Sequence, residues 1–553
     1  MTETGTSRRG FLRGAGVASA GIVGSLAASA APAEAAGTAS APGTRGRQKK
    51  RGYHWLAGDH HLHTLYSNDA MFRVDDQARR ALAGGLDWIV LTDHGNAPYR
   101  DHGLDRAHAD VTAAQRAHGD DLLVFWGLEW NIPGGEHTTL MLAPGADDRE
   151  VMRRLVSQYD ATVVGARDGT PENEALAGEA LRFLADAVRR RRVRDALVLP
   201  NHPARKGIDS PHELRDWQDA APGIVVGFEG SPGHQAAGLP APGMARGRGL
   251  YDGGAGTWSH PGYPEESYRT WGGFDWMTAT VGGVWDSLLA EGRRWWITTT
   301  SDGHQGCGDW VKNPVDPLDQ TGYDTIPYNE AGDTFASTGQ YPPPVNAGRP
   351  VTEYSALPPG HYNKTWVGAE DRSYTGVMEA MRAGRMWVCF GDLVAGLDVQ
   401  VRPRGRTRSG VTLGDTLSVR RGSEVEVVVT IDLADQVNAA GLLPELARVD
   451  LILGAVTGPV ADRDTIVAPD TRVVQSWDTT GRAGTIELVY RFTADRASYV
   501  RLRGTDGKRS QVGYLGADVD PAGPAIDVLG AADPWEDLWF YTNPVFVEVT
   551  DRG

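Results

Sequence analysis

Histidine and carboxylate side chains stand at the ends of two apolar runs in a spacing that can bind a metal ion. His61-Leu62-His63 ends the first apolar run, and Asp302-Gly303-His304 follows the run Trp295–Thr300. Side chains alternate between the two faces of a strand, so residues two positions apart point the same way. We therefore expect His61 and His63 to bind one ion, whereas His60 and Leu62 point away from it.

Further candidate ligands lie between these two motifs in the chain. In chain order these segments are Tyr66-Ser67-Asn68-Asp69, Thr92-Asp93-His94-Gly95, Gly127-Leu128-Glu129, His137 and Asn201-His202-Pro203. Imidazole and carboxylate groups suit Zn, Mn or Fe, and the absence of cysteine from these segments argues against a closed thiolate zinc site. A carboxylate can bridge two ions, and such a pair generates hydroxide near neutral pH. This is the chemistry of a hydrolase.

The segments that must position these residues alternate between strand-like and helix-like patterns. We expect strands over the apolar runs Leu86–Leu91, Leu122–Trp126, Ala196–Leu199, Ile224–Phe228 and Trp295–Thr300. Apolar spacing of three and four predicts helices over Val74–Ala83, Ala107–Ala117, Glu174–Val188 and Val281–Ala290. This alternation predicts an α/β fold of βα units around a parallel sheet or barrel, with the chemistry at the C-terminal ends of the strands.

The predicted secondary structure changes near residue 395 from alternating strands and helices to strands. We assign residues 53–395 to the α/β domain, with long loop insertions at 236–275 and 305–372 that are rich in Gly, Pro, Trp and Tyr. Beyond it, alternating strand runs with almost no helical pattern cover Glu424–Asp432, Val449–Leu453, Ile486–Phe492, Tyr499–Arg503 and Val545–Val549. We expect residues 396–553 to form a second, smaller β-sandwich domain.

The order of the motifs resembles the PHP (polymerase and histidinol phosphatase) family of metal-dependent hydrolases over about residues 55–310. The resemblance implies a distorted (β/α)7 barrel with two or three divalent ions, Zn, Mn or Fe, at its mouth. It places one ion on His61, His63, Glu129 and Asp302, a second on Glu129, His137 and His202, and a third on Asp69, His94 and His304. It also implies catalytic roles for Glu129, Asp302 and His304.

The chain departs from the family pattern in two places. The usual Ser-Asp-Gly reads Ser67-Asn68-Asp69, so the ligand is either Asp69 or Asn68. A carboxylate offsets the charge of a cation and an amide does not, which favours Asp69. His137 follows the turn Pro133-Gly134-Gly135 rather than a clear strand end.

Five residues near these segments have two interpretations each. Arg205 and Lys206 either bind an oxygen of a substrate phosphate or form a solvated pair on a loop. Asp93 either accepts a hydrogen bond from an imidazole or caps a helix or a turn. Glu229 and His234 either reach the site or support its wall.

The first 36 residues carry a targeting pattern. Ser7-Arg8-Arg9-Gly10-Phe11-Leu12-Arg13 precedes a weakly apolar Ala/Gly/Val run and small-residue cleavage sites, and this resembles a twin-arginine signal peptide. We expect a signal peptide over 1–36, a flexible linker over 37–52, and export by the twin-arginine translocase to the periplasm or the extracellular space. The apolar run is too short and too rich in Gly and Ser for a transmembrane anchor, so we expect no stable membrane insertion.

The composition limits the function further. The 553 residues are 41% hydrophobic and 23% charged, which is typical of a soluble globular protein. The formal net charge of −16 argues against nucleic-acid binding, which needs a clustered basic surface. Cys307 and Cys389 are too few for a disulfide framework and either pair or remain unpaired core thiols.

Together these features predict an exported metal-dependent phosphoesterase, acting on a monoester or diester that is a small molecule or part of the cell envelope. Tyr374–Val388 and Thr542-Asn543-Pro544-Val545 resemble the exported carbaryl-hydrolase-like branch of the same family. A hydrolase of carboxylic esters, carbamates or amides on the same metal site is therefore an alternative. A second alternative is a non-catalytic barrel whose β domain binds a cell-surface polymer.

Overall fold

The computed structural model describes residues 52–233, 251, 254–304, 306, 309–314, 323–351, 357–406, 410–528 and 532–551, which form a mixed α/β fold. The expected signal peptide, the expected linker except Gly52, and the residues His234 and Cys307 lie outside them. Among the helices of the described residues, none combines the length and the apolar character that a membrane span requires.

Strands and helices follow one another in the first part of the described chain. They are β1 (His54–Leu62), α1 (Val74–Ala83), β2 (Trp88–Leu91), the π-helix η1 (Tyr99–Gly103), α2 (Leu104–His118), β3 (Leu123–Asn131), β4 (His137–Leu142), α3 (Asp148–Tyr159), α4 (Ala161–Val164), α5 (Pro171–Arg189), β5 (Ala196–Pro200), α6 (Pro211–Ala220), β6 (Gly227–Ser231), the 3₁₀ helix η2 (Glu265–Tyr268), α8 (Trp276–Ala279), α9 (Val284–Ala290) and β7 (Trp296–Thr299).

The later part is dominated by strands. Its elements are β8 (Val311–Lys312), η3 (Tyr323–Thr325), α10 (Phe335–Thr338), β9 (Val345–Asn346), β10 (Asn363–Ala369), α11 (Tyr374–Ala383), β11 (Met386–Phe390), β12 (Val394–Pro403), β13 (Thr416–Arg420), β14 (Ser423–Leu433), β15 (Arg448–Ala455), β16 (Arg472–Asp478), β17 (Thr485–Ala494), β18 (Ser498–Thr505), η5 (Pro534–Glu536), β19 (Trp539–Thr542) and β20 (Val545–Thr550).

Local signals explain where several helices begin and end. The side chains of Thr170 and Ser210 accept hydrogen bonds from backbone N–H groups in the first turns of α5 and α6, and a proline follows each of them. Helix α11 ends at Gly384, whose φ of 74° favours glycine.

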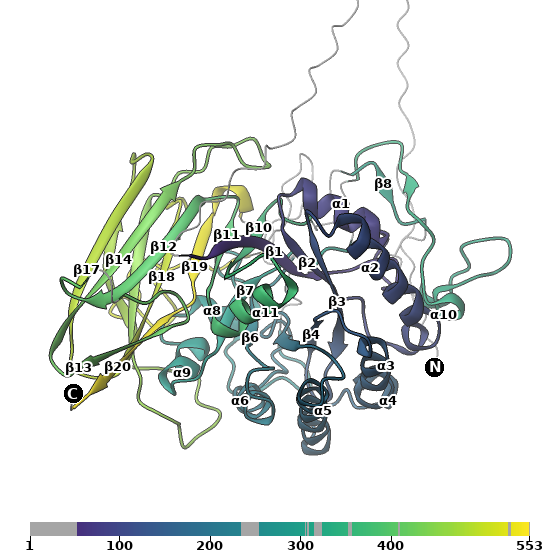
Figure 1. Ribbon diagram of the computed structural model, residues 1–553, viewed down its shortest axis with the longest axis horizontal. Helices are drawn as coiled ribbons and strands as arrows, with labels where there is room; N and C mark the ends of the chain where they lie inside the picture. The colour runs from purple at the N-terminus through teal and green to yellow at the C-terminus, as the bar shows by residue number, and fades with distance from the viewer. Residues whose placement is uncertain are drawn as a thin grey trace, which may run out of the picture. The chain divides into compact units, whose positions relative to one another are not determined.

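Thirteen of the described strands form one sheet with β1 in its interior. β1, β2 and β3 are parallel neighbours, and β4 and β5 continue the sheet antiparallel. On the other side of β1 the order is β10, β11 and then β19, all antiparallel to their neighbours (Figure 1). β19 belongs to the strand-rich residues 396–553, which we call the tail. The strand that carries His61 is therefore paired along both edges.

Backbone hydrogen bonds also connect β5 back to β1 through β6 and β7. Val198 of β5 donates to Ile224 at 2.8 Å and accepts from Val226 at 3.3 Å, just before β6. β6 and β7 are parallel neighbours, and the N–H of His63 donates to the carbonyl of Gly303 beyond β7 at 3.1 Å. β5, the segment that leads into β6, β7 and the end of β1 are thereby linked in that order.

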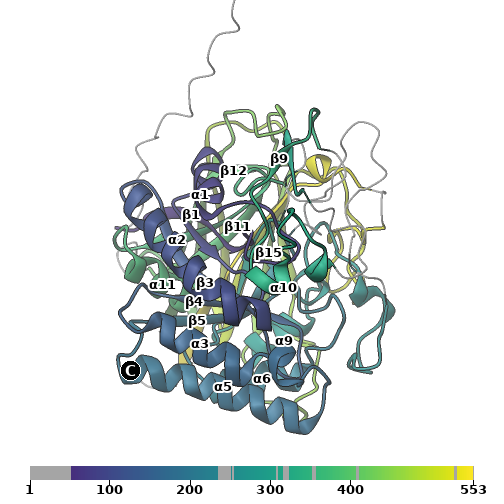
Figure 2. The same ribbon diagram turned by 90° about the vertical axis from the view of Figure 1, so that its right-hand side faces the viewer.

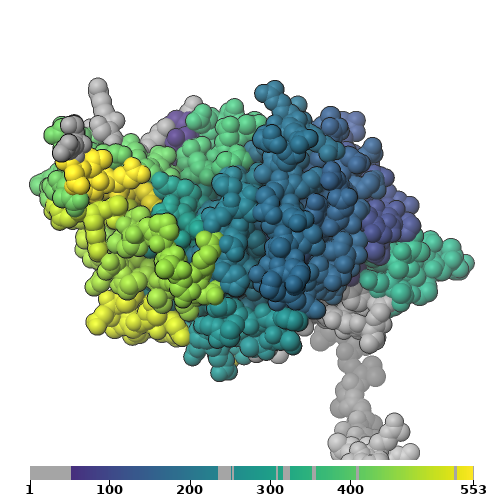
Figure 3. Space-filling view, turned by 90° about the horizontal axis from the view of Figure 1, so that it is seen from below, coloured from purple at the N-terminus to yellow at the C-terminus, as the bar shows by residue number. Residues whose placement is uncertain are grey.

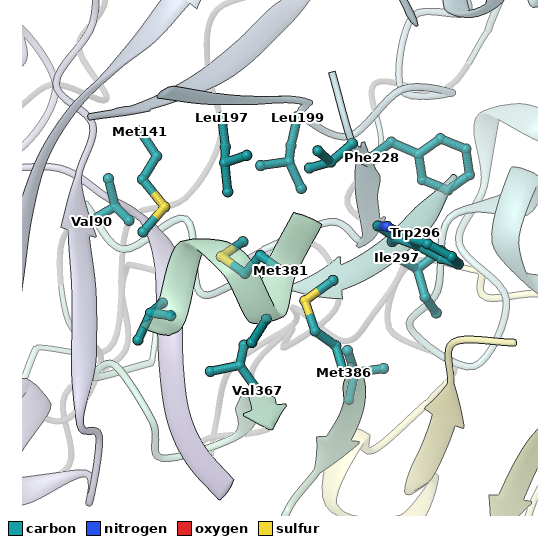
Figure 4. Packing of buried hydrophobic residues seen from close by; sticks show 14 of the residues in the cluster. Val90, Met141, Leu197, Leu199, Phe228, Trp296, Ile297, Val367, Met381 and Met386 are labelled. Atoms are coloured by element: carbon teal, nitrogen blue, oxygen red, sulfur yellow. The ribbon is translucent and has the colours of Figure 1, made fainter. Parts of the chain in front are cut away.

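The helices pack in chain order, and one later helix closes the core. α1, α2, α3, α5 and α6 contact one another successively (Figure 2). Buried side chains of β2, β4, β5, β6, β7, β10 and β11 surround Met381 of α11 (Figure 4). Arg382 of α11 pairs with Asp195 at the start of β5. α11 therefore lies at the end of β5 opposite to the one that leads to His202.

The expected strands and helices of the α/β part correspond to observed elements, with two differences. β3 runs past its expected end at Trp126 to Asn131 and forms an antiparallel hairpin with β4, so no helix separates these two strands. Residues 363–369, at the end of the expected insertion 305–372, form β10 between β1 and β11. Both features depend on pairing between strands, and β10 pairs with a strand that is distant in the sequence. The periodicity of apolar residues does not predict which strands pair.

The tail is joined to the α/β part through buried polar contacts. Arg501 of β18 donates to both carboxylate oxygens of Asp286 in α9, at 2.9 and 2.7 Å, and both side chains are fully buried. Asn543 exchanges two hydrogen bonds with the backbone of Ile297 in β7. In Figure 3 the yellow-green tail lies beside the teal residues that include α9. Besides the large sheet, the tail contains the separate sheet β12-β14-β17. The division into two domains stays a prediction.

Candidate metal centre

β1 ends at two histidines that face each other. The pairing of β1 with β2 shifts register between Asp59 and Leu62, and such an irregularity turns the end of a strand. The Nε2 atoms of His61 and His63 lie 3.1 Å apart, and both rings are buried. His60 points elsewhere, as the alternation of a strand predicts, and its ring nitrogens contact the hydroxyls of Thr139 and Thr298 at 3.2 and 2.7 Å.

The hydroxyl of Ser67 determines which nitrogen of His63 faces the site. It donates to Asp93 at 2.8 Å and accepts from the backbone N–H of His94 at 3.1 Å. Because its only proton goes to Asp93, Nδ1 of His63, 2.8 Å away, must be the donor in that contact. Nε2 of His63 then offers its lone pair to the site. Asp93 contacts Thr64 and Ser67, so of its two interpretations the direct hydrogen bond from an imidazole is not the one observed.

Asp69 lies between two imidazoles. Its carboxylate oxygens are 3.2 Å from Nε2 of His94 and 3.4 Å from Nε2 of His304. The ring of His304 stacks on that of His63 with 3.8 Å between the centroids. Of the two residues that the sequence left open, the structure therefore brings the carboxylate of Asp69 to the histidines.

The hairpin of β3 and β4 brings Glu129 and His137 together. Glu129 lies within β3 opposite Thr139, and His137 is the first residue of β4. The turn between the strands contains Gly134 with φ of 78°, a conformation that glycine adopts without strain. Nδ1 of His137 is 2.7 Å from Oε1 of Glu129. The unusual place of His137 after a turn is thus explained by a short hairpin.

His202 and Asp302 have left-handed backbone conformations. Their φ values are 32° and 47°. A non-glycine residue in this region costs on the order of 1–3 kcal/mol, and such residues concentrate at functional sites. Neighbouring contacts hold both segments: the N–H of His202 donates to Glu229 at 2.8 Å, and the N–H of Ser301 donates to Asp59 at 3.0 Å.

Glu129 is the common neighbour of the histidines. Its Oε1 lies within 3.4 Å of three imidazole nitrogens, on His61 (3.2 Å), His137 (2.7 Å) and His202 (3.4 Å). Its Oε2 lies within 3.4 Å of two more, on His63 (3.4 Å) and His94 (2.7 Å). Oδ1 of Asp302 adds contacts to His61, His63 and His304 at 3.2, 3.2 and 3.3 Å.

The structure therefore brings together all nine residues that the sequence suggested as ligands, His61, His63, Asp69, His94, Glu129, His137, His202, Asp302 and His304. Three groups of donor atoms within 4.8 Å of one another occur among the described residues: His63 with Asp69, His94 and His304, then His61 with His63 and Glu129, and then His94 with Glu129 and His137. His63 and His94 each belong to two groups, whereas the sequence assigned each of them to one ion. Their roles as ligands stay predictions.

Burial and mutual charge set the protonation of the cluster. Burial lowers the pKa of His63 to about 3 and that of His202 to about 4, so both rings are neutral near pH 7. Burial also opposes protonation of His61 and His94, but Asp302 beside the first and Asp69 beside the second outweigh it and raise the pKa of both rings. Burial opposes ionisation of Glu129, but His137, His94 and His61 outweigh it and hold the pKa of Glu129 well below its ordinary value. Glu129 is therefore an anion.

This donor set fits divalent metal ions. Two imidazole nitrogens 3.1 Å apart point at each other in a buried space beside carboxylate oxygens, an arrangement that a shared cation or proton relieves. Imidazole and carboxylate donors without thiolate suit Zn, Mn or Fe. The identity and number of the ions stay predictions.

Glu229 and Asn201 contact the far side of His61. Glu229, buried in β6, has Oε1 3.3 Å from Nδ1 of His61, and the side-chain amide of Asn201 is 2.9 Å from the same nitrogen. The sequence left Glu229 between the site and its wall, and the only signal for it was its position after the run Ile224–Phe228. The structure places it directly behind a candidate ligand.

Arg205 and Lys206 both contact Glu136, which sequence reasoning did not single out. The distances from Glu136 Oε1 are 2.7 Å to Arg205 Nη2 and 3.2 Å to Lys206 Nζ. Glu136 precedes His137 and lies 3.8 Å from its Nε2. Burial opposes ionisation of Glu136, but Arg205 and His137 keep its pKa below the ordinary value. The Lys206 side chain is 45% exposed, so it can meet a solute, and the role of both cations in substrate binding stays a prediction.

Comparison with known families supports the interpretation of one segment of the chain. Residues 59–181 match the PHP domain family. The matched segment contains His61, His63, Asp69, His94, Glu129 and His137 and ends before the other three candidate ligands. No curated protein matches the chain.

Three solved structures show low similarity. A two-domain protein from Bacteroides vulgatus ATCC 8482, containing a predicted PHP-like metal-dependent phosphoesterase, is 18% identical over 80% of this chain and 96% of that one, with a TM-score of 0.31. A candidate metal-dependent phosphoesterase from Bifidobacterium adolescentis is 15% identical over 45% of this chain and 87% of that one, with a TM-score of 0.22. An endo-β-1,4-mannanase from Thermotoga petrophila is 9% identical over 90% and 98%, with a TM-score of 0.21. Such scores support no conclusion about function, which therefore depends on the site.

Proposed function

We propose that this protein is a metal-dependent hydrolase of phosphate esters. The observation that supports the proposal most strongly is the surroundings of Glu129, a buried carboxylate within 3.4 Å of five imidazole nitrogens. Asp69 and Asp302 add carboxylates to the same cluster. Buried charges are costly unless they are paired or bind metals, and a cluster of several buried carboxylates and imidazoles is typical of a metal site.

The residues have distinct tasks in this proposal. Divalent ions bound here would lower the pKa of a coordinated water toward neutrality and polarise the oxygens of the attacked group. Glu129 presents Oε1 to the side of His137 and Oε2 to the side of His94, so it can serve two ion positions. Nδ1 of His304 is 2.9 Å from the carbonyl oxygen of Asp302, which places its proton there and directs Nε2 toward Asp69. We assign catalytic roles to Glu129, Asp302 and His304.

The charge beside the centre supports an anionic substrate. Arg205, Lys206 and Glu136 together carry one net positive charge next to His137. Cationic N–H groups make strong hydrogen bonds to phosphate oxygens. Because both cations already contact Glu136, part of their charge is offset, and this favours the second candidate, a hydrolase of carboxylic esters, carbamates or amides on the same centre.

We further propose a distorted (β/α)7 barrel, a C-terminal β-sandwich and export. The hydrogen bonds that link β5, β6, β7 and β1 support the barrel, and the sheet β12-β14-β17 supports the sandwich. The segment Ser7–Arg13 supports passage through the twin-arginine translocase. The substrate would then be a small molecule or a cell-envelope ester.

Metal analysis coupled to an ester panel tests the function. The full chain is purified from the exported fraction, its metal content is measured, and hydrolysis of p-nitrophenyl phosphate, bis(p-nitrophenyl) phosphate and p-nitrophenyl acetate is followed before and after chelation. We expect two or three ions per chain and phosphatase activity that chelation abolishes and Zn²⁺ or Mn²⁺ restores. Activity on the acetate alone would support the second candidate. Bound metal with no turnover would favour the non-catalytic alternative, and absence of metal would refute the proposal.

A further inference from the structure

We propose that Glu229 is a positioning residue that holds the candidate ligands at the ends of β1, β5 and β7 in one arrangement. This inference rests on the proposed function, because it concerns the same centre. None of the nine candidate ligands comes from β6, yet Glu229 of this strand contacts the segments that carry three of them. Its carboxylate is fully buried.

The contacts of Glu229 divide between its two oxygens. Oε1 is 3.3 Å from Nδ1 of His61 and accepts a hydrogen bond from the hydroxyl of Thr300, two residues before Asp302. Oε2 accepts the backbone N–H of His202 at 2.8 Å and the side-chain amide of Asn201 at 3.4 Å. One side chain therefore joins β1 to the segments that follow β5 and β7.

The contact with His61 restrains the side of the ring that faces away from the other candidate ligands. Nδ1 of His61 lies 3.3 Å from Oε1 of Glu229 and 2.9 Å from the amide nitrogen of Asn201, so the far side of the ring is held by two polar side chains. Nε2 on the opposite side of the ring faces Glu129 and Asp302, both 3.2 Å away. A carboxylate behind a ligating histidine fixes the ring and raises its basicity, and loss of such a partner typically weakens metal binding about 10–100-fold.

The contact with His202 restrains an unfavourable backbone. His202 has φ of 32°, and its N–H is bound by Glu229 at 2.8 Å. Without this acceptor the segment after β5 loses a hydrogen bond that fixes its left-handed conformation, and the imidazole of His202 loses its fixed approach to Glu129.

The segment after Glu229 packs closely against Asp302. Gly233 has φ of 56°, and a Cβ atom added there would lie 2.1 Å from Cβ of Asp302. A side chain at this position must push Asp302 away from its present place. The segment Glu229–Gly233 therefore touches candidate ligands at both of its ends.

Zinc binding by the full chain tests the inference. Metal-free wild type and Glu229→Gln are titrated with Zn²⁺ in competition with a chromogenic chelator, and the melting temperature of each metal-free protein is recorded. We expect about 10–100-fold weaker Zn²⁺ binding in Glu229→Gln. The melting temperature should not fall, because the amide oxygen of Gln can still accept the N–H of His202 and the variant no longer buries a charge. Glu213→Gln is the matched control, because Glu213 is also a buried glutamate but accepts its hydrogen bonds from Ser210. It should bind Zn²⁺ as the wild type does.

Gly233→Ala provides an independent test if Glu229→Gln fails to fold. Its control is Gly165→Ala, since Gly165 has φ of 76° but a Cβ there meets nothing within 4 Å. We expect weaker Zn²⁺ binding in Gly233→Ala alone. Unchanged Zn²⁺ affinity in Glu229→Gln, or equal effects of the two alanine variants, would overturn the inference. Failure of the wild type to bind Zn²⁺ would instead overturn the proposed function.

Discussion

The variant Glu129→Gln tests the metal centre at its most connected residue. The substitution keeps the size of the side chain and removes one negative charge from the point where five imidazole nitrogens lie within 3.4 Å. Two unit charges about 4 Å apart interact by about 4 kcal/mol at an effective dielectric constant of about 20. Since about 1.4 kcal/mol corresponds to a factor of ten, we expect Zn²⁺ binding and kcat/KM for an aryl phosphate to fall about a thousandfold.

The assay compares Zn²⁺ titration and p-nitrophenyl phosphate hydrolysis at saturating metal. Glu213→Gln carries the same chemical change at a buried glutamate of α6 and should match the wild type in both measurements. Near-ultraviolet circular dichroism shows whether Glu129→Gln keeps its tertiary packing. A folded variant that retains affinity and activity within tenfold of the wild type would refute the role given to Glu129.

Three further predictions concern stability and substrate charge. Burial raises the pKa of Glu213 from 4.5 to about 7, so the free energy of unfolding should fall by about 3 kcal/mol as pH rises from 4.5 through 7. Urea unfolding should show this fall in the wild type and a smaller dependence on pH in Glu213→Gln. The same pH dependence in both proteins would contradict the prediction. Asp286→Ala leaves Arg501 buried without its partner and should lower the free energy of unfolding by about 3–5 kcal/mol without weakening Zn²⁺ binding. An unchanged midpoint of urea unfolding would contradict this stabilising role of the ion pair. Lys206→Ala should raise KM for p-nitrophenyl phosphate about tenfold and leave KM for p-nitrophenyl acetate unchanged. Equal effects on both esters would show that Lys206 does not bind the negative charge of the phosphate.

Much of the local structure follows from short-range patterns in the chain. The spacing of apolar residues predicts a helix over Val74–Ala83, and α1 has these bounds. The expected helix Glu174–Val188 lies within α5, and the run Glu424–Asp432 lies within β14. The sequence predicts a loop where β10 forms, because seven residues behind a Gly- and Pro-rich stretch carry little periodicity. It forms by pairing with β1, about three hundred residues earlier, and with β11.

The candidate ligands were identifiable from residue type and position, and their supporting residues were not. Histidines and carboxylates after apolar strands are visible in the sequence, as in Asp302-Gly303-His304. Ser67 orients His63 through a hydroxyl, and Glu229 reaches His61 across 168 positions of the chain. Serine and glutamate in such places are common for many reasons, so their roles depend on knowing what lies opposite them.

The amino-acid order settles the matters that the backbone controls over a few residues: where strands and helices run, and which donors follow each strand. Folding in three dimensions settles the rest: that five imidazoles meet at Glu129, that Glu136 binds Arg205 and Lys206, and that His202 and Asp302 take left-handed conformations. The physical reason is range. Helix and strand periodicity arises from neighbouring dihedral angles, whereas these contacts arise only when strands from distant parts of the chain pair and pack.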